Sequence, residues 1–210
     1  MKALFTQAWR CVGLIAVVLL AGCAGQSVKT APKAAYSHGG LYEQVPLSPD
    51  EQISLIALAK TQVGKPYIWG AQTPERGFDC SGLLVWGYDR LGMGRFRYKD
   101  STVNDVTADS LYKYNSYPLT DLVQLRQGDF IFFDPKNQGY ETHVALFSHI
   151  DNLGRIWVWD ASSSAGRTSQ RPLPNFWNMR PVFGRPMKLI PATGERVAAG
   201  FRAGPVMVVN

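Results

Sequence analysis

The stretch of sequence that decides the fold is Phe78-Asp79-Cys80-Ser81-Gly82-Leu83-Leu84-Val85-Trp86-Gly87-Tyr88. Asp79 can accept hydrogen bonds from the amides of a first helical turn, so it predicts a helix that begins at Cys80. Leu84, Gly87 and Tyr88 recur at helical spacing and form one packed face. We therefore expect Cys80 in the first turn, where free amides and the helix dipole stabilise a thiolate.

An earlier helix is predicted by Ser48-Pro49-Asp50-Glu51. Ser48 can cap the first turn, Pro49 fits the first helical position, and Glu51 can close a capping box. Gly64 is a natural end for this helix. From Gly128 onward the sequence consists of short apolar runs, which predict antiparallel strands at 130–133, 144–147 and 155–159. Helices followed by strands indicate an α+β domain.

Length and composition predict one domain, because 210 residues fill one hydrophobic core but are short for two. The formal net charge of +6 comes without a dense stripe of Lys and Arg, so we expect no nucleic-acid partner. The sequence holds no HExxH and no paired Cys spacing, so we expect neither a metal nor another cofactor. We expect a monomer.

The first 22 residues have the layout of a secretory signal, with Lys2 and Arg10 ahead of an apolar run over 12–20. That run is much shorter than the ~20 residues that span a bilayer. It ends in Leu20-Ala21-Gly22-Cys23, which resembles the lipobox of bacterial lipoproteins. The resemblance implies acylation of Cys23 and, with Ala24 next, anchoring in the outer membrane facing the periplasm. A buried helix that ends at a chance cysteine is the alternative.

Residues 24–47 are rich in Ala, Gly, Ser, Lys and Pro and lack a sustained apolar period, so they predict a flexible tether. Cys11 would leave with the signal and Cys23 would carry lipid, so Cys80 would be the only thiol of the mature chain. Such a thiol is either an inert buried residue or a nucleophile. We divide the chain into a signal peptide (1–22), a lipidated Cys and tether (23–47), a catalytic domain (48–191) and a C-terminal tail (192–210).

A general base for Cys80 must come from His38, His143 or His149. His38 lies in the predicted tether, and His149 lies beside a predicted turn, which indicates a solvated side chain. His143 opens a predicted strand, and from a strand end its imidazole can face a helix terminus. We therefore take His143 as the candidate base.

Asp160 is the candidate orienting group, because it shares strand parity with Ile156 and Val158. If those two face the core, Asp160 does too, and an unpaired buried carboxylate is costly. Pairing with His143 would remove that cost and select the imidazole tautomer. The alternative is a strand-end cap for the turn at 162–164.

Four segments in order resemble the NlpC family of papain-like cell-wall peptidases: 64–70 (GKPYIWG), 78–83 (FDCSGL), 128–133 (GDFIFF) and His143-Val144. The likeness spans residues 50 to 190. It implies a papain-like fold in which N-terminal helices, with the catalytic Cys at a helix start, pack on an antiparallel β-sheet. It also implies hydrolysis of peptidoglycan stem peptides, at the bond from γ-D-glutamate to diaminopimelate or lysine.

The resemblance assigns roles to five residues. Cys80 matches the family's nucleophile and His143 its base. Tyr67 matches a tyrosine whose hydroxyl lies near the thiolate and helps to bind the oxyanion or the substrate, although a core aromatic is an equal alternative. Asp79 and Ser81 match residues that shape the substrate groove.

Asp160 departs from the family, whose third polar residue is usually His and sometimes Asn or Gln. A carboxylate can orient an imidazole and favours its charged form. The departure keeps two alternatives to a peptidase open. One is a wall-binding lipoprotein that has lost turnover, and the other is an amidase or acyltransferase that uses the same Cys and His.

Overall fold

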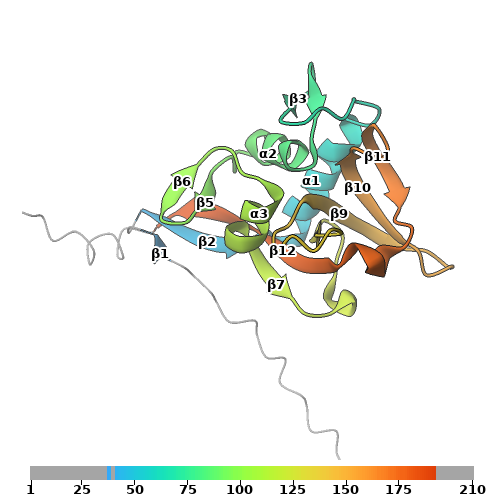
Figure 1. The fold of residues 1–210 in the computed structure, drawn as a ribbon. Coiled ribbons are helices and arrows are strands. Elements are labelled where there is room, and N and C mark those ends of the chain that lie inside the picture. Colours follow the sequence, from blue (N-terminus) through green and yellow to red (C-terminus); the bar gives the residue numbers. More distant parts are fainter. Residues whose placement is uncertain (1–36, 39–40, 193–210) are drawn as a thin grey trace, which may run out of the picture. The chain divides into compact units, whose positions relative to one another are not determined.

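The computed structural model describes residues 37–38 and 41–192. Within them lies an α+β domain whose main sheet has the strand order β1-β2-β12-β8-β9-β10-β11, with β7 also paired to β12 (Figure 1). Its pairings are antiparallel, so the predicted fold class is confirmed. The strands are β1 Ser37–His38, β2 Tyr42–Pro46, β7 Ser116–Leu119, β8 Phe130–Phe133, β9 His143–Ile150, β10 Ile156–Ser162, β11 Arg167–Pro172 and β12 Pro181–Pro191.

Three α-helices and two small hairpins complete the described part of the chain. The helices are α1 Pro49–Thr61, α2 Cys80–Arg90 and α3 Ala108–Asn115, with 3-10 turns η1 Leu122–Gln124 and η2 Phe176–Met179. The hairpins pair β3 Gln72–Thr73 with β4 Gly77–Phe78, and β5 Phe96–Tyr98 with β6 Ser101–Val103. Helices α1 and α2 pack on each other and against β10 (Figure 1).

Helix α1 begins as the sequence predicts. The Ser48 hydroxyl accepts a hydrogen bond from the Glu51 amide at 3.2 Å, and the Glu51 carboxylate accepts one from the Ser48 amide at 2.9 Å. The helix ends at Thr61, and Gly64 then takes φ +87°, a conformation that costs glycine little. The three strands predicted after Gly128 are also present, with β9 and β10 longer than expected.

The predicted tether is wrong at its C-terminal end. Strand β2 lies inside the range 23–47 and pairs antiparallel with β12, from Tyr42 opposite Pro191 to Pro46 opposite Met187. The partner strand was not foreseen, and without it a five-residue run rich in polar side chains carries little strand signal. Strand β1 also lies inside this range and pairs with β2. The tether residues before 37 and at 39–40, with Cys23, the signal peptide and the tail from 193, lie outside the described residues.

The central strands of the main sheet are buried on both faces, and each face has its own core. In β8, Phe130 and Phe132 pack with the helices, whereas Ile131 and Phe133 face the other cluster. The alternation continues in β10, where Ile156 and Val158 belong to the second cluster. The first cluster holds, among others, Leu55, Leu83, Leu84, Tyr88, Val144, Leu146 and Trp159, and the second holds Leu119, Ala145, Phe147, Leu173, Phe176 and Phe183.

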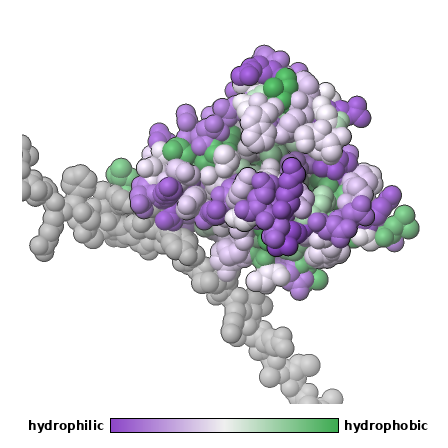
Figure 2. Space-filling view, in the orientation of Figure 1, coloured by the Kyte–Doolittle hydropathy of each residue, from purple (hydrophilic) through white to green (hydrophobic). Residues whose placement is uncertain are grey.

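The segment 95–127, in which no motif was recognised, contributes α3, β5, β6 and β7. Thr107 caps α3 by accepting from the Ser110 amide at 3.2 Å. The face shown in Figure 2 carries mostly hydrophilic and intermediate residues, with small hydrophobic patches between them. None of the helices in the described ranges has both the length and the apolar character needed to traverse a lipid bilayer.

Candidate active site

Cys80 is the first residue of α2 and is buried, with 6% of its surface exposed. Asp79 caps the helix by accepting from the Gly82 amide at 2.7 Å and from the Ser81 hydroxyl at 3.1 Å. The other carboxylate oxygen of Asp79 accepts from the Gly70 amide at 2.8 Å. One side chain therefore holds both the helix start and the preceding loop, which gives the Cys80 sulfur a defined position.

The loop before α2 approaches the helix so closely that only glycine fits at position 82. A Cβ on Gly82 would lie 2.2 Å from the carbonyl oxygen of Ala71. That same oxygen accepts a hydrogen bond from the Asp79 amide at 2.8 Å. The absent side chain at Gly82 is thus what lets the loop close over the first turn.

His143 opens β9 and stands between Cys80 and Asp160. Its Nε2 lies 2.8 Å from Oδ2 of Asp160, and the Cys80 side chain hydrogen-bonds to the ring as well. Burial opposes protonation of the ring, but the hydrogen bonds that the ring makes with Asp160 and Cys80 prevail and raise the pKa of His143 to about 9.

Asp160 is 1% exposed and is held on two sides. Besides His143, it binds the guanidinium of Arg171, with Nε 3.0 Å from Oδ1 and Nη2 2.6 Å from Oδ2. Burial acts to raise the pKa of Asp160, and the hydrogen bonds from His143 and Arg171 outweigh it, so the pKa is lowered. Asp160 is therefore an ionised carboxylate inside the protein.

Arg171 was missed in the sequence. It lies on β11, where it opposes Val158, while Ser169 opposes Asp160. A residue two positions along the partner strand points to the same face, so the hairpin register places Arg171 diagonally across from Asp160. A buried carboxylate needs a cation. The sequence contains an arginine on the strand that follows Asp160, and this could have identified Arg171 as the partner.

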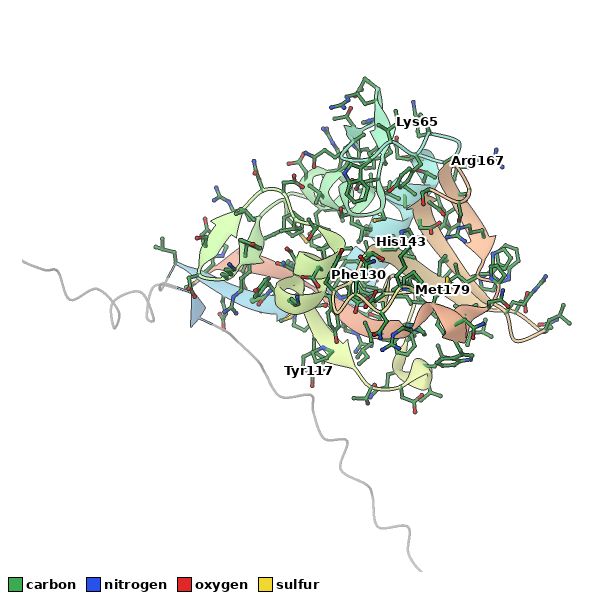
Figure 3. All side chains as sticks on the ribbon, viewed as in Figure 1. Lys65, Tyr117, Phe130, His143, Arg167 and Met179 are labelled. Atoms are coloured by element: carbon green, nitrogen blue, oxygen red, sulfur yellow. The ribbon has the colours of Figure 1, made fainter. Side chains whose placement is uncertain are left out.

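Tyr67 lies beside Cys80, in the loop that joins α1 to the hairpin β3–β4. The loop is tied to β11 and to the turn before it: the Thr168 amide donates to the Lys65 carbonyl at 2.8 Å, and the Tyr67 amide donates to the Gly166 carbonyl at 2.9 Å. Figure 3 shows Lys65 close to Arg167 at this junction. Burial, together with the charges of Cys80 and Asp79, raises the pKa of Tyr67 to about 12, so its hydroxyl keeps its proton.

A groove of about 900 Å³ opens in front of Cys80. Asp79 and Ser81 line it, as the resemblance implies. Its opposite wall comes from residues for which the sequence predicted no role. Glu141 lies in that wall, and its burial, together with the negative charges of Asp134 and Asp109, raises its pKa to about 7. Among the residues of that wall are Tyr98, Lys99, Asp105, Asp109, Lys113, Tyr114, Tyr140 and Glu141.

The remaining histidines do not join this site. The His149 ring is exposed and stacks on Trp157 at 5.6 Å, near the far end of β9 (His143, at its start, is labelled in Figure 3). The side chain of His38 lies outside the described residues. Across the described ranges, Cys80 is the one free cysteine, and no three His, Cys, Asp or Glu side chains gather as metal ligands.

Known proteins resemble this chain over the segment that carries the site. A sequence model of the NlpC/P60 family matches residues 64–181. "Probable endopeptidase YafL" of Escherichia coli (strain K12) is 31% identical over 86 residues, covering 41% of this chain and 31% of that protein. "Murein DD-endopeptidase MepH" of the same strain is 34% identical over 86 residues, covering 41% and 29%.

A third relative is "Peptidoglycan endopeptidase RipB" of Mycobacterium tuberculosis, 32% identical over 122 residues, which are 57% of this chain and 46% of RipB. This chain thus spans less than half the length of these relatives. Among solved structures, an NLP/P60 family protein of Staphylococcus aureus described as similar to lipoprotein is 24% identical, with a TM-score of 0.49, over 67% of this chain and 43% of the other.

Proposed function

The chain belongs to the NlpC/P60 family, and from that premise we propose that it is a cysteine endopeptidase that hydrolyses peptidoglycan stem peptides. The observation that carries the proposal is the position of His143, which hydrogen-bonds both the Cys80 sulfur and the buried Asp160 carboxylate. Relatives described as murein or peptidoglycan endopeptidases support the substrate class. The expected bond joins γ-D-glutamate to the diamino acid.

In the proposed mechanism the Cys80 thiolate attacks the scissile carbonyl carbon, and a C–S bond forms as the carbonyl oxygen takes up the negative charge. In this proposal the free amide of Cys80 at the helix start and the Tyr67 hydroxyl donate hydrogen bonds to that oxyanion. The His143 imidazolium then gives its proton to the leaving amine as the C–N bond breaks. His143 next takes a proton from water, and the resulting hydroxide attacks the thioester carbon. The C–S bond breaks, which releases the carboxylic acid product and regenerates the Cys80 thiolate.

The test uses the purified parent protein, defined muropeptides and water enriched in ¹⁸O. Hydrolysis at the expected bond produces a peptide that starts with the diamino acid and one ¹⁸O atom in the γ-carboxyl of D-glutamate, both read by mass spectrometry. Cleavage at another bond would contradict the specificity, and product without ¹⁸O would indicate acyl transfer. Tyr67→Phe in the same assay measures the contribution of the hydroxyl to kcat.

A protein that has lost turnover can be recognised by the reactivity of its Cys80 thiol. If no muropeptide is cleaved, the pH dependence of iodoacetamide alkylation still reports on Cys80, because an activated thiol reacts well below the ordinary thiol pKa of ~8.5. An unreactive Cys80 together with uncleaved muropeptides would favour the wall-binding alternative and refute the peptidase proposal.

We further propose that Cys23 is acylated and anchors the protein in the outer membrane. The support is the Leu20-Ala21-Gly22-Cys23 segment at the end of an apolar run. We expect labelled palmitate to enter the parent protein and the protein to fractionate with outer membranes. Cys23→Ala should lose both properties, and a labelled, membrane-bound Cys23→Ala protein would contradict the proposal.

A further inference from the structure

Asp160 and the Arg171 guanidinium that binds it stand at the position where the resembled family usually has a single His. The side chain of Asp160 is fully buried, and that of Arg171 is 21% exposed. The guanidinium fork engages both carboxylate oxygens, at 3.0 and 2.6 Å. Such a bidentate arrangement fixes the plane of a carboxylate as well as its charge.

The geometry couples Arg171 to the imidazole through one atom. Oδ2 of Asp160 lies 2.6 Å from Nη2 of Arg171 and 2.8 Å from Nε2 of His143. A bare buried carboxylate at that distance would over-stabilise the imidazolium and make it a reluctant proton donor to a leaving amine. A guanidinium on the same oxygen cancels the carboxylate's net charge and keeps its direction.

We propose that Arg171 is a positioning residue that neutralises and orients Asp160, so that the Asp160–Arg171 pair presents His143 with a hydrogen-bond acceptor carrying no net charge. The pair then orients the His143 ring as an uncharged hydrogen-bonding side chain would. This inference rests on the proposed function for its catalytic meaning, but its electrostatic content can be measured without turnover.

The charged and titratable groups around His143 come from three elements. Cys80 faces the ring from α2, Asp160 faces it from β10, and Arg171 stands behind Asp160 on β11. Phe133 of β8 stacks on the ring at 5.8 Å and carries no charge. Removing Cys80 leaves Asp160 in contact with the imidazole and Arg171 bound to the same carboxylate oxygen.

The experiment follows the His143 ring by NMR as the pH changes, in a Cys80→Ala background that needs no hydrolysis. His143→Gln in that background identifies the resonance. We expect Arg171→Met to move the titration midpoint upward by about one unit or more, because Asp160 loses its counter-charge. Asp160→Asn should move it downward by a similar amount, because Arg171 then acts alone. Asp160→Asn with Arg171→Met should return it close to the background value.

Chemistry is measured in parallel in the active protein. Arg171→Met should lower kcat about tenfold or more and move the alkaline limb of the kcat profile upward, with KM little changed. Arg171→Lys keeps the positive charge but loses the bidentate contact with Asp160. The alkaline limb of its kcat profile should therefore stay where it is in the parent, while kcat falls. If the parent cleaves no muropeptide, the proposed function fails, and the NMR titration still decides the inference.

Arg185 provides a matched control. It forms the other buried Arg–Asp fork of the described chain, with its Nε and Nη2 at 3.2 and 3.1 Å from the Asp129 carboxylate, and its side chain is 23% exposed. Arg185→Met should lower the melting temperature and leave the His143 midpoint unchanged. If Arg171→Met behaves like Arg185→Met, Arg171 is only structural and the inference is overturned.

The outcome can be decided even if Arg171→Met fails to fold. The single variant Asp160→Asn is then compared with the double variant Asp160→Asn plus Arg171→Met. The double variant has lost both charges of the pair, so it leaves neither of them buried without a partner. An upward move of the His143 midpoint on removing Arg171 supports the inference. An unchanged midpoint, or a move in the opposite direction, overturns it.

Discussion

Cys80→Ala is expected to abolish hydrolysis of muropeptides, with a fall in rate on the order of 10⁴-fold or more. Alanine removes the sulfur that forms the thioester, and neither a metal-ligand cluster nor another cysteine lies within the described ranges. Since Cys80 is 6% exposed and belongs to the helix-side core, the loss of one sulfur there should leave the fold intact. The rate is measured by mass analysis of muropeptide products.

Two controls make the Cys80→Ala result specific. Iodoacetamide should label the parent protein at Cys80 and leave the variant's position 80 unlabelled. Cys23→Ala, which removes the other cysteine expected in the mature chain, should digest soluble muropeptides at the parent rate. Digestion by Cys80→Ala at a rate within tenfold of the parent would refute the nucleophile and, with it, the proposed mechanism.

His143→Gln is expected to lower kcat roughly 10²–10⁴-fold, the usual contribution of a positioned general acid and base. Glutamine can still hydrogen-bond Asp160, but it cannot carry a proton to the leaving amine. In the parent, the imidazolium persists at neutral pH and is lost as the pH rises through about 9. Activity should therefore fall above about pH 9 in the parent, and this limb should be absent from the residual activity of the variant.

His149 offers a matched control on the same strand. It stacks on Trp157, and its Nδ1 lies 3.1 Å from the Ser148 hydroxyl, away from Cys80. His149→Gln should therefore keep both the rate and the alkaline limb. A parent profile that falls near pH 6.5 instead of pH 9, or equal effects of the two substitutions, would contradict the assignment of His143.

The helix that carries Cys80 and the strand that starts at His143 could be predicted from the sequence because their signals are local. A cap, an apolar period and a turn depend on side chains within one or two turns of each other, as at Asp79 before α2 and Ser48 before α1. The burial of Asp160 followed from strand parity, another local property. These elements needed no knowledge of their neighbours.

Pairing between distant segments was decided only in the folded chain. Strand β2 has a weak signal of its own and exists because β12 pairs with it, which is why the predicted tether extended too far. Arg171 reaches Asp160 through the register of the β10–β11 hairpin, and the far wall of the groove comes from 98–114 and 140–142. Contacts of this kind depend on register and on approach across many residues, and local periodicity carries no information about either.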